Sequence, residues 1–325
     1  PATAEAAEPR RRAKPTGKPK LEPPSAIGEE RLSQLEDVAR LASPVFFSTR
    51  ADGTIERGVH SVPLPGQAGG RPVLFVGNHQ LLGFDGPLIV RELLLERGTL
   101  VRSLVYPALM GDSLPLAPLE YPPRGTAEVF RAYGARPASA RALLSLLGAG
   151  EAVLLFPGGG REVFKRKGER YRLFWPETPD LVRLAARCDA LIVPFSGIGS
   201  DELAEVVLDT DELLALPSIG PWLLERAAAL PSLVADDYFV PPLVAPRVDG
   251  IPRHYWLFHA PVDMRALDAS DAEAVRQAYA ELQATVSNGV DLLLRRREDD
   301  PYASFALRTV YERLVEGKQA PSWTP

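Results

Sequence analysis

Short apolar runs that alternate with longer amphipathic segments constrain the fold of this chain more than any other feature. Five runs have the length of a buried strand and are flanked by Gly or Pro. They are Val73–Gly77, Leu100–Val105, Ala152–Phe156, Ala190–Phe195 and His254–His259. Apolar residues at helical spacing occupy Gly86–Arg97, Ala138–Leu147, Pro179–Arg187 and Ala272–Arg297. Strands separated by helices of this length predict an α/β fold with a mostly parallel central sheet flanked by helices.

The chain divides into a basic arm, a long folded part and a short tail. Residues 1–20 hold six Lys or Arg against two Glu and show no apolar periodicity. We therefore expect residues 1–30 to form a disordered, basic arm or linker rich in Pro and Ala. Residues 31–316 carry the strand and helix pattern and are expected to form one domain. Residues 317–325 are expected to form a flexible tail.

Composition excludes several classes of protein. The 325 residues carry 37 Lys or Arg against 42 Asp or Glu, and this net charge of −5 argues against binding to nucleic acid. The single cysteine, Cys188, excludes a disulfide framework and a Cys-rich zinc site. No run reaches the roughly 18 apolar residues of a membrane span, so any membrane contact is expected to be peripheral. Neither a Walker loop nor a dinucleotide-binding glycine motif is present, and we expect no cofactor and no metal.

The segment that follows the apolar run Val73–Gly77 holds the first candidate for chemistry. His79 comes just after this expected strand, at the edge of an α/β sheet where sites collect. It is a candidate general base, and Asp85, six residues on, is a candidate to orient its ring. The alternative is structural: Asp85 would be the N-cap of the following helix, ahead of Pro87, and backbone groups would satisfy the histidine. The two interpretations are compatible, because an N-cap carboxylate can also orient a histidine.

A glycine-rich segment follows the apolar run Ala152–Phe156. Gly158, Gly159 and Gly160 leave the backbone free to present N–H groups to an anion or oxyanion. Arg161 adds a planar charged fork for phosphate or carboxylate. The alternative is a tight turn followed by a surface arginine.

Two further segments allow a ligand and a structural interpretation. A basic cluster could hold an acyl carrier, a coenzyme A phosphate or an anionic lipid headgroup, or could be a solvated charged face. Its members are Arg161, Lys165, Arg166, Lys167, Arg170 and Arg172. The apolar segment Leu213–Leu233, with Trp222, is either a helix that docks on a bilayer or a core helix.

Taken together, these segments resemble the glycerolipid acyltransferase superfamily. Asn78-His79 with Asp85 is similar to its first block, at the spacing of the branch related to monoacylglycerol and diacylglycerol acyltransferases. The third block is similar to Phe156-Pro-Gly-Gly-Gly-Arg-Glu162, without the block's usual glutamate after Pro, and the fourth to Ile192-Val-Pro-Phe195.

Within that superfamily the chain most resembles the acyltransferase part of the phytyl ester synthase/diacylglycerol acyltransferase family of plants and algae. The resemblance spans about Ser43 to Tyr311, and Lys165–Glu177 is its most specific stretch. Members of this family usually carry an α/β-hydrolase domain upstream of this part. The resemblance implies a glycerolipid-acyltransferase-like fold and a plastid location, at the thylakoid or plastoglobule surface.

The resemblance also implies an activity: acyl transfer from acyl-CoA or acyl-carrier protein to phytol or diacylglycerol, at a membrane or lipid-droplet surface. His79 would remove the hydroxyl proton, Asp85 would orient the ring, and no covalent acyl-enzyme would form. The glycine segment and Arg161 would stabilise negative charge or hold the donor. The residues expected to contact substrate are Asn78, Gly158, Gly159, Gly160, Arg161, Glu162, Lys165, Arg166 and Lys167.

Two other functions stay open at this point. One is a lysophospholipid acyltransferase, although its third block would more typically keep the glutamate that Gly158 replaces. The other is a catalytically silent module that binds a lipid surface or an acyl carrier; the presence of both His79 and Asp85 argues against it.

Overall fold

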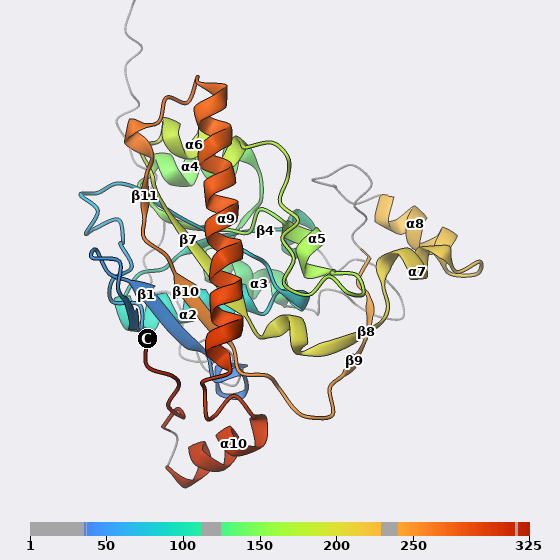
Figure 1. Ribbon diagram of the computed structural model, residues 1–325. Helices are drawn as coiled ribbons and strands as arrows, with labels where there is room; N and C mark the ends of the chain where they lie inside the picture. The colour runs from blue at the N-terminus through green and yellow to red at the C-terminus, as the bar shows by residue number, and fades with distance from the viewer. Residues whose placement is uncertain (1–35, 37, 112–124, 229–239, 316–317) are drawn as a thin grey trace, which may run out of the picture.

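A nine-stranded sheet forms the centre of the part that the computed structural model describes, residues 36, 38–111, 125–228, 240–315 and 318–325 (Figure 1). Its strand order is β2-β1-β10-β7-β3-β6-β4-β5, with β11 also paired to β7. The strands are β1 Val45–Thr49, β2 Ile55–Arg57, β3 Val73–Gly77, β4 Arg102–Val105, β5 Arg136–Pro137, β6 Ala152–Leu155, β7 Leu191–Ile198, β10 Tyr255–Phe258 and β11 Val262–Asp263. The run from β7 to β5 is parallel throughout, as is the β1–β10 pair. The mostly parallel central sheet predicted from the sequence is confirmed.

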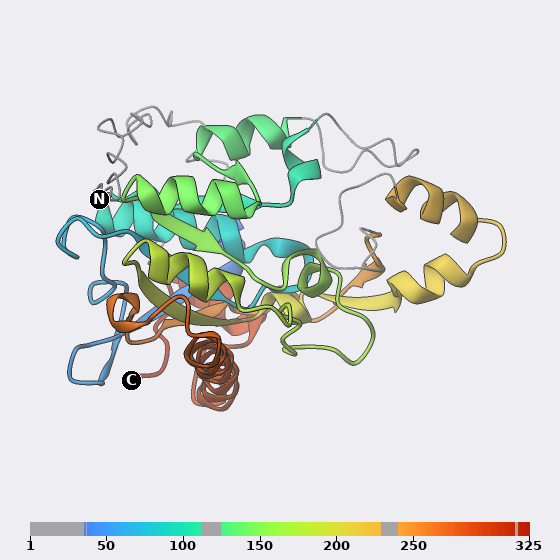
Figure 2. The same ribbon diagram turned by 90° about the horizontal axis from the view of Figure 1, so that it is seen from above.

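Helices cover both faces of this sheet because its central strands are apolar on both sides. Phe75 of β3 packs with the cluster that includes α2 (Asp85–Arg97). Its neighbours Leu74 and Val76 point to the opposite face, as successive side chains of a strand do. That face is covered by α4 (Ala140–Gly148), α6 (Asp180–Arg187) and α9 (Ala272–Arg297). Figure 1 shows α9 lying lengthwise over the sheet, and Figure 2 shows the same helix nearly end-on.

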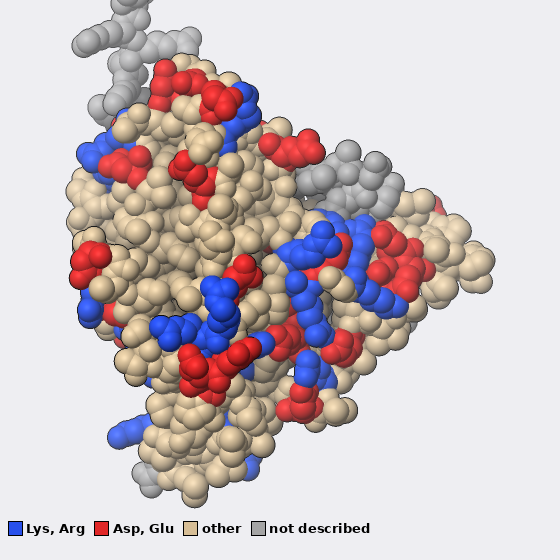
Figure 3. Space-filling model, in the orientation of Figure 1, with Lys and Arg blue, Asp and Glu red and all other residues tan. Residues whose placement is uncertain are grey.

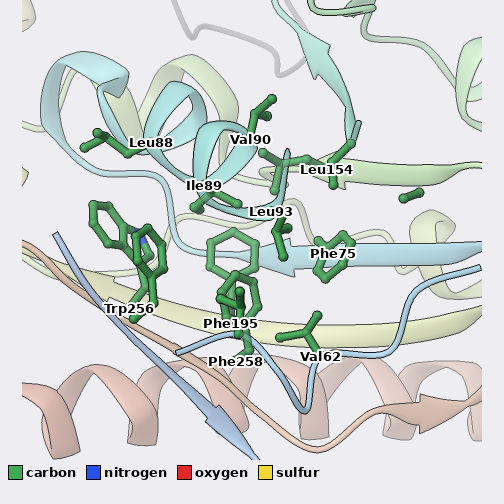
Figure 4. Packing of buried hydrophobic residues seen from close by; sticks show 14 of the residues in the cluster. Val62, Phe75, Leu88, Ile89, Val90, Leu93, Leu154, Phe195, Trp256 and Phe258 are labelled. Atoms are coloured by element: carbon green, nitrogen blue, oxygen red, sulfur yellow. The ribbon is translucent and has the colours of Figure 1, made fainter. Parts of the chain in front are cut away.

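The packing of α2 fixes the position of the candidate site. Ile89 and Leu93 are completely buried and lie over the aromatic side chains of the central strands (Figure 4). Among those rings, Phe195 and Phe75 lie 5.8 and 5.9 Å from the ring of Phe258. The first turn of α2, which carries Asp85, is thereby held at the carboxyl end of β3.

A small second sheet carries an arm that projects from the body of the protein (Figures 1 and 2). It pairs β8 (Ala204–Leu208) with β9 (Leu243–Pro246), and the helices α7 (Thr210–Ala215) and α8 (Gly220–Ala228) follow β8. Ile219 and Leu224 are each more than 40% exposed. Over residues 213–228 the core-helix interpretation is therefore wrong, and the rest of that apolar segment lies outside the described residues.

The remaining helices are short. They include α3 Thr126–Ala132, α5 Gly159–Val163, α10 Phe305–Leu314 and the 3₁₀ turns η2 Leu81–Gly83, η3 Pro107–Met110, η4 Ser200–Glu202 and η5 Met264–Ala266. Within the described ranges, every helix is too short or too polar to cross a membrane. The basic arm expected at residues 1–30 lies outside those ranges.

The C-terminal segment differs from the flexible tail expected at residues 317–325. The ring of Trp323 lies 4.7 Å from the rings of both Phe47 and Tyr255 and is 8% exposed. Arg253, itself buried, donates a hydrogen bond of 2.7 Å to a backbone carbonyl of this segment. Residues 318–325 are thus packed against β1 and β10, because Trp323 and the backbone carbonyls of Ala320 and Pro321 find buried partners there.

Candidate active site

The segment after β3 begins with Asn78, which links β3 to β7. Gly77 ends β3 so close to Phe195 of β7 that a Cβ atom would lie 2.4 Å from its ring. Asn78, 2% exposed, donates to the carbonyl oxygen of Gly197 at 2.9 Å and accepts the N–H of the same residue at 2.8 Å. The amide of Asn78, expected to contact substrate, is therefore used to join β3 and β7 where His79 emerges.

His79 and Asp85 form the pair that the sequence predicts. His79 Nδ1 lies 2.8 and 2.9 Å from the two oxygens of Asp85, whose side chain is completely buried. Because an ionised carboxylate can only accept, Nδ1 carries the proton and Nε2 is left as the acceptor. The imidazole stacks on Phe156 with ring centroids 3.8 Å apart and is 16% exposed. The ring is held from two sides, and its Nε2 is the atom suited to accept a proton from a substrate.

The structural alternative for Asp85 is not borne out. Phe84 takes the position that precedes α2, and Asp85 is the first helical residue. The carboxylate of Asp85 turns back to accept the N–H of Gln80 at 2.8 Å as well as the histidine proton. Asp85 thus orders the loop and orients the ring at the same time.

Two buried charged side chains bond the backbone of His79, and a third is paired with one of them. Glu162 accepts the N–H of His79 at 2.6 Å, and Lys165 donates to the carbonyl oxygen of His79 at 2.6 Å. Lys165 also lies 3.2 Å from Asp201, and all three side chains are 3% exposed or less. Burial raises the pKa of the Glu162 carboxyl. Lys165 and the two backbone N–H groups that bond the Glu162 carboxylate lower this pKa and partly offset the effect of burial. Glu162 and Lys165, both expected to contact substrate, are bonded to the backbone of His79.

Asp201 is the site residue that sequence reasoning misses. It lies in η4, and its two oxygens accept the N–H of Leu81 at 2.7 Å and that of Tyr171 at 2.6 Å. It therefore joins the loop after His79 to the loop of the basic cluster. No motif marks this aspartate, which is 122 positions from His79 in the sequence.

The glycine segment forms a turn and the short helix α5. Gly159 has φ +45° and donates its N–H to Phe156 at 3.1 Å, so this group is already part of the turn. A Cβ atom on Gly158 would lie 2.2 Å from the carboxyl carbon of Glu162. Glycine at position 158 therefore makes room for the carboxylate that holds His79. Gly160 accepts the N–H of Phe164 at 2.9 Å through its carbonyl oxygen.

Arg161 is held in a fixed orientation rather than projecting freely. Its guanidinium forms two hydrogen bonds to Glu169, at 2.8 and 2.5 Å, and lies 3.8 Å from the ring centroid of Phe174. The arginine lowers the pKa of the Glu169 carboxyl against the opposing effect of burial. Its charge is thus oriented by the protein before any ligand arrives.

The outer members of the basic cluster are paired with acidic side chains of the projecting arm. Arg166 bonds Asp211 at 2.9 Å, Lys167 bonds Glu212 at 2.6 Å and Arg170 bonds Glu205 at 2.6 Å. These pairs are partly or largely exposed. Figure 3 shows the blue side chains gathered between the body of the protein and the arm, with red side chains beside them.

Two further titratable groups, His254 and Cys188, form no hydrogen bond to the His79–Asp85 pair. His254 is buried, bonds Ser200 at 2.7 Å, and has its pKa lowered to about 4 by burial. Cys188 follows α6, and burial raises the pKa of its thiol. Within the described ranges, no group of three or more His, Cys, Asp or Glu side chains is arranged to hold a metal ion.

A His–Asp pair lies at the carboxyl end of a parallel strand, which is the position at which α/β proteins collect their functional sites. Over 294 residues, 86% of the chain, it is 35% identical to phytyl ester synthase 1, chloroplastic, of Arabidopsis thaliana. It is 33% identical over 284 residues, 83% of the chain, to phytyl ester synthase 2, chloroplastic, of the same plant. The chain is therefore homologous to phytyl ester synthases over most of its length, which confirms the resemblance seen in its motifs.

The chain matches only part of the length of these two relatives. The chain spans 40% and 38% of the lengths of these two relatives. Both names carry the word chloroplastic, in agreement with the plastid location that the resemblance implies. No protein-family model matches the chain. In a comparison of structures it is similar to the 1-acyl-sn-glycerophosphate (LPA) acyltransferase PlsC of Thermotoga maritima, with a TM-score of 0.47 and 17% identity, over 82% of this chain and 80% of that one.

Proposed function

We propose that this protein is an O-acyltransferase that moves a fatty acyl group from a thioester to a lipid hydroxyl in the plastid. The donor would be acyl-CoA or acyl-carrier protein, and the acceptor phytol or diacylglycerol. One observation carries the proposal: the ring of His79 is oriented by the buried carboxylate of Asp85, so that Nε2 is left to accept a proton. The homology to phytyl ester synthases supports this type of chemistry over others.

In the proposed mechanism His79 acts first as a base and then as an acid. Nε2 takes the hydroxyl proton while the acceptor oxygen attacks the thioester carbonyl carbon. The new C–O bond forms, and the carbonyl oxygen carries the negative charge of the tetrahedral intermediate. The C–S bond then breaks, and the proton on Nε2 passes to the leaving sulfur, which returns His79 to its starting state. Asp85 stabilises the imidazolium between the two steps.

Arg161 and the glycine segment are the proposed source of stabilisation for the negative charge. Arg161 is already oriented by Glu169 and Phe174, which reduces the reorganisation needed when charge develops on the substrate. Gly158, Gly159 and Gly160 lie between Phe156, on which His79 stacks, and Arg161. Asn78, Glu162 and Lys165 act through the position of His79.

The acceptor is insoluble in water, so the enzyme is proposed to work at a lipid surface without spanning it. The exposed apolar side chains Ile219 and Leu224 of the arm are suited to such contact. Trp222, with Arg226 stacked 4.5 Å from its ring, combines an aromatic ring with a cation, as interfacial segments do. Peripheral contact at a thylakoid or plastoglobule surface is therefore part of the proposal.

The test uses the purified chain with liposomes that contain both phytol and diacylglycerol, and labelled acyl-CoA. Wild type and His79→Ala are assayed side by side, with acyl-carrier protein as the second donor. We expect product from the wild type and a loss of about 100-fold or more in the variant. The dominant product then identifies the acceptor. Equal product from both proteins would refute His79 as the base, and no product with either donor would favour a binding module.

A further inference from the structure

A cleft of about 420 Å³ opens beside the loop that carries His79. It lies between the basic cluster and β8, and Leu81, two residues after His79, forms part of its wall. Its charged lining consists of Lys165, Arg166, Lys167, Arg170, Asp201 and Glu205. The cleft and the His79 site share Lys165, which donates to the carbonyl oxygen of His79 at 2.6 Å.

The lining of this cleft carries an excess of positive charge. Four of its side chains are Lys or Arg and two are acidic, and Figure 3 shows blue side chains gathered over this region. Asp211 and Glu212, which pair with Arg166 and Lys167, belong to α7 and lie outside the lining. The inner face of the cleft is therefore basic, although each of these cations has a partner.

The basic loop is built to hold this arrangement. The carboxylate of Glu169 accepts the backbone N–H of Arg166 at 2.7 Å, and Asp201 accepts that of Tyr171 at 2.6 Å. Gly168, with φ +78°, permits the turn between the two anchored ends. A loop fixed in this way presents Lys167 and Arg170 with little conformational freedom left in its backbone. The exposed ion pairs of these two side chains can be exchanged for a stronger contact with phosphate.

We propose that this cleft binds a phosphate group, and that in the reaction it holds the phosphate on the pantetheine arm of the thioester donor. The inference rests on the proposed acyl transfer. The neutral acceptors carry no phosphate, whereas coenzyme A and acyl-carrier protein both carry one on this arm. The Glu205 carboxylate, which bonds Arg170 at 2.6 Å, occupies the place of the phosphate until the donor binds. Release of Arg170 from Glu205 is thus the switch between the empty and the loaded cleft.

Calorimetric titration of the purified chain with three probes tests the role of the phosphate. The probes are coenzyme A, 4′-phosphopantetheine, and pantetheine, which lacks the phosphate. We expect the first two to bind, with pantetheine at least about tenfold weaker. Equal affinity for pantetheine and 4′-phosphopantetheine would overturn the proposal.

Variants that should weaken and a variant that should strengthen the binding of coenzyme A test whether it binds in this cleft. Arg170→Gln and Lys167→Gln should each weaken the binding of coenzyme A by about tenfold, since each removes a contact to an anion. Glu205→Gln should strengthen it, because Arg170 no longer has a competing carboxylate. Arg276→Gln is the matched control: this exposed arginine of α9 pairs with Glu273 and should leave the affinity unchanged. Identical effects of Arg170→Gln and Arg276→Gln would refute the assignment.

A vesicle-binding measurement distinguishes the thioester donor from a phospholipid headgroup as the source of the phosphate. Vesicles of phosphatidylglycerol should bind wild type and Arg170→Gln equally. If Arg170→Gln instead loses only vesicle binding, the phosphate belongs to a lipid and the donor assignment is wrong. These measurements need no turnover. Coenzyme A binding without acyl transfer would refute the proposed function alone. Acyl transfer, with an affinity for coenzyme A that does not change in Arg170→Gln, would refute the phosphate site in the cleft alone.

Discussion

The buried lysine behind His79 allows a sharp test of how the site is held together. Lys165 is 3% exposed and donates to the carbonyl oxygens of His79 and Glu162 at 2.6 and 3.1 Å, besides its ion pair with Asp201. Lys165→Met keeps much of the side-chain volume but removes the cation. The buried carboxylates of Asp201 and Glu162 are then left without this neighbouring cation. Breaking a buried pair in this way costs about 3–5 kcal/mol of unfolding free energy.

Urea denaturation of the purified chain measures this loss, and two further variants control it. Lys167→Met removes a lysine two positions away, whose side chain and that of its partner Glu212 are 45% and 42% exposed. It should leave the stability nearly unchanged, because exposed pairs contribute little. The double variant Lys165→Met/Asp201→Asn should recover part of the loss, since no unpaired aspartate charge remains. Its recovery is partial, because Asp201 also accepts the N–H groups of Leu81 and Tyr171.

The pH dependence of the Lys165→Met variant adds a second readout. Burial already raises the pKa of the Glu162 carboxyl, and Lys165 counteracts that effect. Without the lysine the pKa rises further above that of the unfolded chain, so the folded state favours the protonated acid. The stability contributed by that proton is lost as the pH rises, and the variant should lose more at pH 8 than at pH 5. Equal stability of Lys165→Met and Lys167→Met at both pH values would refute the role of Lys165 as a buried clamp.

Three other changes have defined outcomes. Asp85→Asn should lower acyl transfer by about 10²–10⁴-fold at unchanged fold, because His79 loses its oriented tautomer; a rate within threefold of wild type would contradict this. His254 has a pKa of about 4 in the folded state, below the unfolded value, so its protonation favours the unfolded chain. Between pH 6.5 and 4 this histidine should lower the unfolding free energy by roughly 3 kcal/mol. A His254→Asn variant whose stability falls with the same slope would exclude that histidine. Trp323→Ala should cost about 3–5 kcal/mol in thermal or urea unfolding, as it empties the space against Phe47.

The sequence predicts those parts of the fold and site that depend on neighbours in the chain. The five apolar runs become β3, β4, β6, β7 and β10, because burial on both faces requires continuous apolar residues. The Asp52-Gly53 dipeptide lies between β1 and β2, which pair antiparallel. His79 and Asp85 are six residues apart across one loop, so their contact also follows from local order.

Long-range partners are what the sequence does not reveal. Trp323 is read as part of a flexible tail because its partners, Phe47 and Tyr255, are about 70 or more positions away. Asp201 has no neighbouring motif, yet it joins two loops of the site. In each case the deciding interaction is a contact that exists only after the sheet has formed.

The basic cluster shows why a charge pattern alone cannot separate a scaffold from a binding surface. Lys165 and Lys167 are two residues apart in a run of cations, and the sequence gives both the same interpretation. In the folded protein Lys165 is enclosed with Asp201 and bound to the carbonyl of His79, so a ligand could replace none of its contacts without opening the site. Lys167 keeps an exposed partner that water or an anion can displace. Burial therefore separates the two lysines: Lys165 supports the loop of His79, and Lys167 is the one that the proposed donor could contact.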